Sequence, residues 1–197
     1  MRRDDLVLGS VEFADLLAIG LLLPLLPQMA RRFGLGVPGA AALVAVPVIT
    51  ALLAAVWLGP LSARWGRKSV LVGTCLVTAE ALFVLAWAGD AFMLFMARLA
   101  TGVAAGNVAV VEASRRDLSR EAEAGPSWKP AGWSLGAGLA TGVVIGAVVG
   151  GASASAAAYA GGAVAVASLV GVVALLHETL PVSERARMPA RRGVRSH

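Results

Sequence analysis

Gly59-Pro60-Leu61-Ser62-Ala63-Arg64-Trp65-Gly66-Arg67-Lys68 is a short basic stretch that joins two long apolar segments of the chain. Glycine and proline allow a tight turn, and the basic residues favour the cytoplasmic side of a membrane. The segment on either side has the roughly 20 mostly apolar residues that a helix needs to cross a bilayer. We therefore interpret the stretch as a cytoplasmic turn between two membrane-spanning helices.

The composition of the whole chain is that of a membrane protein. It is 58% hydrophobic and 15% charged, with a mean hydropathy of +0.78, outside the range of soluble domains. The period-two alternation of a transmembrane barrel is absent. We predict an all-α polytopic membrane protein with six transmembrane helices in residues 1–180, followed by a basic, disordered cytoplasmic tail at 181–197. The six predicted spans are Leu6–Ala30, Ala40–Leu58, Ser69–Gly89, Ala91–Val111, Ala131–Gly151 and Ala156–Leu176.

The distribution of basic residues predicts the orientation of these spans. Of the 17 Lys and Arg residues, Arg98 lies within a span and only Arg31 and Arg32 lie in loops on the side opposite to the N-terminus. The remaining fourteen lie on the side of the two termini, and cytoplasmic loops carry the excess of basic residues. We expect a multi-pass protein of the cytoplasmic membrane with both termini in the cytoplasm. Because the basic residues are spread over membrane loops, we do not expect a nucleic-acid partner.

The turn sequence resembles the signature G-x-L-a-D-r-x-G-r-k, which joins the second and third helices of the major facilitator superfamily. The matching positions are Gly59, Leu61, Arg64, Gly66, Arg67 and Lys68. Further stretches resemble drug-exporting members in chain order: Asp15, Pro24 and Pro27 in the first span, Arg98–Gly106, Gly142–Gly151, and His177–Pro181 after the sixth span. Usual members have twelve helices in two similar halves. The resemblance covers the whole chain and implies the N-terminal six-helix half.

The resemblance also implies an inner gate at the cytoplasmic surface. In the family, the basic position matched by Arg67 pairs with an acid at the inner end of the fourth span. We assign this role to Gly59, Arg64, Gly66, Arg67 and Lys68, with Glu112 and Asp117 as the candidate acids. Two positions depart from the family, since Ala63 replaces an Asp and Ala147 replaces a Pro. That Asp acts across the interface with the second half; its absence fits a chain without that half, and simple divergence explains it as well.

Charged residues inside the spans are the candidates for a substrate or proton path, because such residues are costly in a bilayer and usually paired or functional. We assign this path to Glu12, Asp15, Arg98 and Asn107. Opposite charge and compatible depth predict that Asp15 pairs with Arg98, and Glu80 is the second candidate partner. A purely structural ion pair explains the same charges, so both interpretations stay open.

A stripe of glycines marks one face of the fifth span. Gly138, Gly142, Gly146 and Gly150 recur every four residues, and small residues at this spacing let two membrane helices approach closely. Packing against a helix of the same chain is one interpretation. The resemblance favours the other, an interface between halves, so we predict that Gly142 and Gly146 lie against a helix of another chain.

Enzymatic roles find little support in the sequence. Gly132-Trp133-Ser134-Leu135-Gly136 matches G-x-S-x-G, and His177 ends the sixth span on the same side, so an intramembrane serine protease is a minor alternative. We expect no enzyme, no catalytic residue, no cofactor and no metal site.

The function that the sequence predicts is that of a half-size secondary transporter. We expect it to export a small amphiphilic compound in a proton-linked manner, as a homodimer or with a second six-span half or another membrane protein. The alternative is a non-transporting scaffold or accessory subunit of a membrane complex. The lipid bilayer is the partner in either case.

Overall fold

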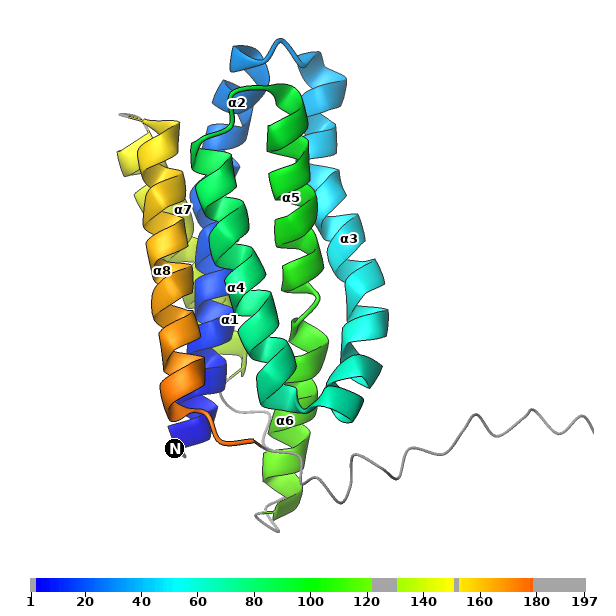
Figure 1. Ribbon diagram of the computed structural model, residues 1–197. Coiled ribbons are helices and arrows are strands. Elements are labelled where there is room, and N and C mark those ends of the chain that lie inside the picture. The colour runs from blue at the N-terminus through cyan, green and yellow to red at the C-terminus, as the bar shows by residue number, and fades with distance from the viewer. Residues whose placement is uncertain (1–2, 122–130, 151–152, 179–197) are drawn as a thin grey trace, which may run out of the picture.

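The computed structural model describes residues 3–121, 131–150 and 153–178, and this part of the chain is helical, without a strand (Figure 1). The predicted tail at 181–197 lies outside these residues. The elements are α1 (Arg3–Leu22), a 3-10 turn (Leu23–Leu25), α2 (Leu26–Arg32), α3 (Gly36–Trp65), α4 (Arg67–Ala86), α5 (Ala91–Ala105), α6 (Val108–Glu121), α7 (Ala131–Gly150) and α8 (Ala154–Leu175).

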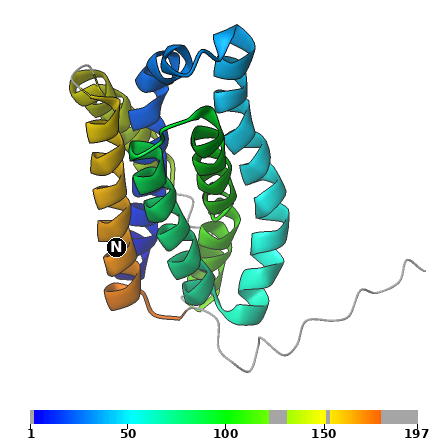
Figure 2. The same ribbon diagram turned by 45° about the horizontal axis from the view of Figure 1, so that its top comes forward.

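The helices run side by side as one bundle (Figures 1 and 2). α1 packs against α7 on one side and against α8 on another, while α4 packs against α8 and α5. α3 lies at an edge, where it packs mainly against α5. The N-terminus and the end of α8 lie at the same end of the bundle, as an even number of spans requires.

Two spans are broken, and the break in the first has a local cause. The first runs from Leu6 to Arg32 and contains the 3-10 turn, where Pro24 and Pro27 occupy the second positions of the turn and of α2. Proline lacks the N–H of a regular helical turn. The fourth runs from Ala91 to Leu118 and is interrupted between α5 and α6 at Gly106 and Asn107.

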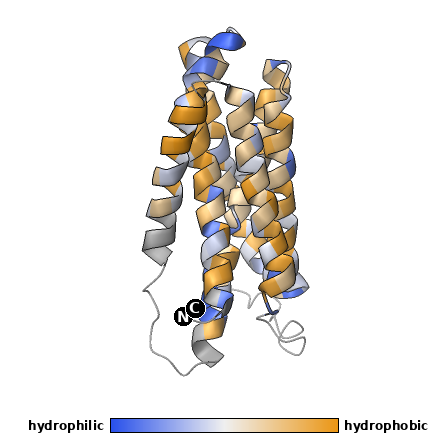
Figure 3. Ribbon diagram, turned by 90° about the vertical axis from the view of Figure 1, so that its left-hand side faces the viewer, coloured by the Kyte–Doolittle hydropathy of each residue, from blue (hydrophilic) through white to orange (hydrophobic). Residues whose placement is uncertain are grey.

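Within the described residues, five helical segments are long and apolar enough to cross a membrane, by length and composition. α7, the fifth predicted span, has its apolar stretch at Gly136–Val149. In Figure 3 apolar residues dominate the middle of the helices, and hydrophilic residues gather toward the ends of the bundle. The predicted fold class, a helical polytopic membrane protein, is therefore confirmed.

The predicted turn at Gly59–Lys68 is shorter than expected. α3 continues to Trp65 with Pro60 inside it, and α4 begins at Arg67. Gly66 alone joins the two helices, with φ of 99°, which glycine adopts without a Cβ clash. The fourth span also exceeds its prediction, since it continues past Val111 to Leu118.

The buried interior has two apolar clusters with polar side chains between them. One cluster, nearer the α2–α3 end, contains Leu21, Leu82 and Leu94, and the other, nearer the N-terminus, contains Leu8, Leu71 and Val110. The sequence order along α1, α4 and α8 places Asp15, Thr78 and Ser168 between the two clusters, and Thr74 lies one turn from Thr78, beside Cys75 of the second cluster. This polar layer crosses the middle of an otherwise apolar bundle.

Candidate functional site

The polar layer is centred on the break in the fourth span. Asn107 is 1% exposed and donates from its Nδ2 atom to Asp15 Oδ2 at 2.8 Å, with Thr74 Oγ1 at 3.4 Å. Its Oδ1 atom accepts no hydrogen bond from any described residue. Buried polar atoms are normally satisfied, so this amide presents an open acceptor inside the bundle.

Arg98 lies near this layer but does not form the predicted ion pair with Asp15. Its Nε atom donates to the carbonyl oxygen of Leu43 on α3 at 3.0 Å, and no ion pair of the described residues includes it. Pro47 explains this choice, because a proline within a helix leaves the carbonyl four residues before it without a helical donor. The charge of Arg98 is therefore directed to a backbone oxygen of α3.

Asp15 and Arg98 nevertheless line one small cavity, of about 20 Å³, together with Thr78 and Thr101. Such a volume holds about one water molecule. The two residues that the sequence assigned to a path thus flank a polar space.

The link between Arg98 and Pro47 gives a prediction. In the Pro47→Ala variant, the new N–H of residue 47 can donate to the Leu43 carbonyl. Arg98→Met should therefore lower the stability less in that variant than in the unmodified protein. A hydrogen bond to a charged group contributes about 1.5–3 kcal/mol, and the difference between the two backgrounds should approach that range. Thermal unfolding of the four variants in detergent measures it; equal costs in both backgrounds would show that proline does not direct Arg98.

Glu12 forms a buried ion pair that the sequence did not predict. Arg115 on α6 donates from Nη1 and Nη2 to its two carboxylate oxygens, each at 2.7 Å. The side chain of Glu12 is 6% exposed and that of Arg115 is 9% exposed, so the pair is buried in the bundle. Arg115 was counted as a loop residue. Val111, Arg115 and Leu118 recur at helical spacing, which in the sequence indicates that the span continues past Val111. All three are buried in the structure.

Some of the residues assigned to the inner gate lie together around Arg67. Arg67 Nε lies 3.1 Å from Asp117 Oδ2, and Arg67 Nη1 donates to Ser62 Oγ at 2.6 Å. The backbone N–H of Arg67 donates to Glu178 Oε1 at 2.8 Å. The predicted pairing of Arg67 with an acid on the fourth span is confirmed for Asp117.

Other gate residues differ from this pattern. Glu112 instead pairs with Arg116 one turn away, on the exposed surface. Lys68 Nζ donates to the carbonyl of Val173 on α8 at 2.8 Å, and Arg64 is exposed. Gly59 contributes a carbonyl that accepts from Arg67 Nη1 at 3.3 Å. Arg67 is thus the centre of a network that joins α3, α4, α6 and the end of α8.

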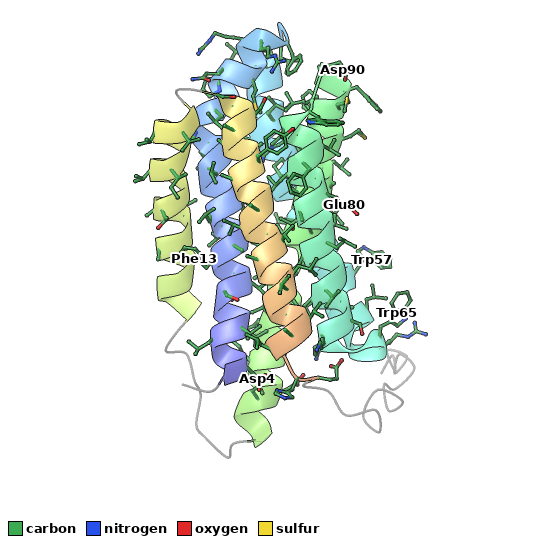
Figure 4. The ribbon with its side chains drawn as sticks, turned by 60° about the vertical axis from the view of Figure 1, so that its left-hand side comes forward. Asp4, Phe13, Trp57, Trp65, Glu80 and Asp90 are labelled. Carbon is green, nitrogen blue, oxygen red and sulfur yellow. The ribbon has the colours of Figure 1, made fainter. Side chains whose placement is uncertain are left out.

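The glycine stripe of α7 packs within the chain, so its predicted role as an interface with another chain is wrong. A Cβ at Gly138 would lie 2.6 Å from the Phe13 carbonyl oxygen of α1. A Cβ at Gly142 or Gly146 would collide with the carbonyl oxygens of Leu17 and Leu21. Figure 4 shows α7 beside α1 near Phe13. Gly150 ends α7.

Two remaining predictions are also corrected. Glu80 lies exposed on the outer face of α4, so it is not a buried partner of Arg98 (Figure 4). Ser134 lies within α7 rather than at a strand-to-helix elbow, and His177 Nδ1 is 3.2 Å from Asp4 Oδ1. The geometry that G-x-S-x-G requires is therefore not formed. No group of three or more potential metal ligands occurs in the described residues.

Comparisons with known proteins agree with this architecture. The model of the major facilitator superfamily matches residues 8–195. The class B tetracycline resistance protein of Escherichia coli is 28% identical over 131 residues, which cover 64% of this chain and 33% of that protein. The crystal structure of the human organic anion transporter MFSD10 (TETRAN) superposes with a TM-score of 0.71 at 24% identity, over 93% of this chain and 49% of that one. The chain spans half or less of the length of these proteins, and it belongs to the major facilitator superfamily.

Proposed function

We propose that this six-helix bundle is one half of a secondary transporter of the cytoplasmic membrane, with its termini in the cytoplasm. It exports a small amphiphilic compound in exchange for protons. The observation that carries the proposal is the polar layer, in which Asn107 donates to Asp15, while Asp15 and Arg98 line a small space in the interior of an apolar bundle. Acids and amides within a bilayer mark substrate and proton pathways.

The proposal includes a second six-helix unit, either a second copy or a different half. α3 supports it, because only 6% of its apolar stretch is buried within the bundle. Its exposed residues include Val48, Leu52, Val56 and Trp57. Transporters of this family place their binding site between two repeats, so a face of this bundle is expected to contact the second unit.

Tetracycline is the first substrate to test, because the class B resistance protein is similar over 131 residues. Inside-out membrane vesicles containing the protein should take up tetracycline when a pH gradient is imposed. Asp15→Asn should reduce that uptake at least tenfold, because it removes the carboxylate that exchanges the proton while the amide keeps the hydrogen-bonding shape.

The matched control is Asp90→Asn. Asp90 caps the start of α5, where its side chain accepts from the Met93 N–H at 2.7 Å, and asparagine caps a helix equally well. This control should transport normally. Full uptake by the Asp15 variant would contradict the proposed proton path.

An accessory-subunit role is the second candidate, favoured by Ala63, which is 5% exposed where the family usually has an acid. Vesicles that show no uptake of tetracycline or of organic anions, and a protein that copurifies with another membrane complex, would support it.

A further inference from the structure

The outer face of α4 carries a carboxylate in an otherwise apolar stripe. Glu80 is exposed, and no hydrogen bond or ion pair to it forms among the described residues. The exposed residues on the same helical face are Gly73, Leu76, Val77, Phe83, Val84 and Trp87. Glu80 belongs neither to the polar layer nor to the network around Arg67.

The position of Glu80 makes a bare carboxylate unfavourable. It lies six residues from the end of α4, so roughly 9 Å along the helix axis from that end. Acids at such depth almost always face the bundle interior and pair with another group. Among the described residues, none therefore supplies on the outer face of α4 the counter-charge that this acid requires.

An aromatic hollow lies on the same face, toward the end of α4. It has a volume of about 370 Å³ and is lined by Phe83, Val84, Trp87, Met93 and Tyr159, from α4, α5 and α8. The rings of Phe83 and Tyr159 are tilted, with centroids 6.2 Å apart. Val84 and Trp87 follow Glu80 by four and seven residues, so the hollow continues the stripe that contains the acid.

We propose that Glu80 and this hollow form a binding site for a lipophilic cation whose charge is enclosed by aromatic groups. The carboxylate supplies the counter-charge, and the faces of the aromatic rings attract a cation. The volume and the apolar lining suit an aryl body. A membrane lipid with an amine headgroup fits less well, because its charge lies at the surface, above the depth of Glu80.

This site is separate from the proposed transport path, because Glu80 faces outward and Asp15 faces the interior. Binding here needs no transport. It can therefore be tested in a protein that moves no substrate, and failure of one proposal leaves the other standing.

The test uses two probes of the same shape and opposite charge, tetraphenylphosphonium and tetraphenylborate. The protein is placed in phosphatidylcholine nanodiscs, and binding above that of empty nanodiscs is measured by equilibrium dialysis. We expect saturable binding of the phosphonium and at least tenfold weaker binding of the borate. Glu80→Gln should weaken phosphonium binding at least tenfold, and Glu80→Asp should retain more of it.

Two further variants separate the site from general effects. Asp90→Asn removes a negative charge near Met93 but keeps the helix cap, and it should bind the phosphonium as the unmodified protein does. Trp87→Leu should weaken binding through loss of its ring. The unfolding temperature of each variant checks that the bundle is intact.

Three outcomes would overturn the proposal. Equal binding of both probes would show that the hollow binds apolar compounds without selecting their charge. Unchanged phosphonium binding in Glu80→Gln would place the cation elsewhere. Absence of phosphonium binding, together with a dimer in native mass spectrometry that Glu80→Gln dissociates, would assign this face to a second copy of the chain.

Discussion

Replacing Arg115 by methionine should destabilise the bundle by about 3–5 kcal/mol, the usual cost of removing one partner from a buried ion pair. Glu12 would lose two charge-assisted hydrogen bonds of 2.7 Å, while its carboxylate stays in the interior between α1 and α6. Urea unfolding in mild detergent, followed by tryptophan fluorescence, measures the loss.

The double variant Glu12→Gln with Arg115→Met should be more stable than the sum of the single losses predicts, because both charges of the pair are removed together. Arg116→Met is the matched control on the next residue. Arg116 is 70% exposed in its pair with Glu112, and exposed pairs contribute below about 1 kcal/mol. A loss at Arg115 no larger than that at Arg116 would show that the buried pair does not hold α6 against α1.

Gly146→Leu should have the second large effect, separation of α7 from α1. The new side chain would meet the backbone of Leu21 rather than a movable side chain, so the two helices must move apart. Overpacking costs about 1–3 kcal/mol and sometimes more. We expect the upper part of that range or beyond, seen as a lower unfolding temperature and a reduced yield of monodisperse protein.

The same helix supplies a control for this substitution. A Cβ at Gly136 would meet nothing within 4 Å, so Gly136→Leu should keep the stability of the unmodified protein. If both variants unfold alike, the close approach of α1 and α7 does not contribute to stability.

The sequence predicted features that depend on composition and on the spacing of residues. Apolar length indicated the spans, and the resemblance of the motif around Arg67 predicted a contact with Glu112 or Asp117, of which the structure shows Asp117. The glycine stripe correctly indicated a face of close packing. It could not identify the neighbour, because spacing within one helix describes that helix alone. The partner is α1, where a Cβ at Gly20 would collide with the carbonyl of Leu139.

Ion pairs were predicted less well. The sign of two charges and their depth in the membrane do not show which other groups compete for the same partner. Arg98 has the right sign and depth for Asp15, yet the carbonyl freed by Pro47 is nearer in the folded bundle. Arg115 was assigned to a loop because a basic residue after an apolar run is typical of a span end. The helical spacing after Val111 indicated a longer span, and the structure shows that Arg115 is buried within it.

The ends of α3 have a mechanical consequence. The helix is 30 residues long, about 45 Å at the usual rise. It is joined to α4 by Gly66 and to α2 through Gly34 and Gly36, and all three glycines have positive φ. A rod of that length that swings by about 5° around one end displaces the other by about 4 Å. Glycines lie at both ends of α3, and little of its surface packs against the bundle. The helix is therefore suited to rotate as a rigid rod about one end. Small rotations at Gly66, beside the Arg67 network, become large displacements at the opposite membrane surface.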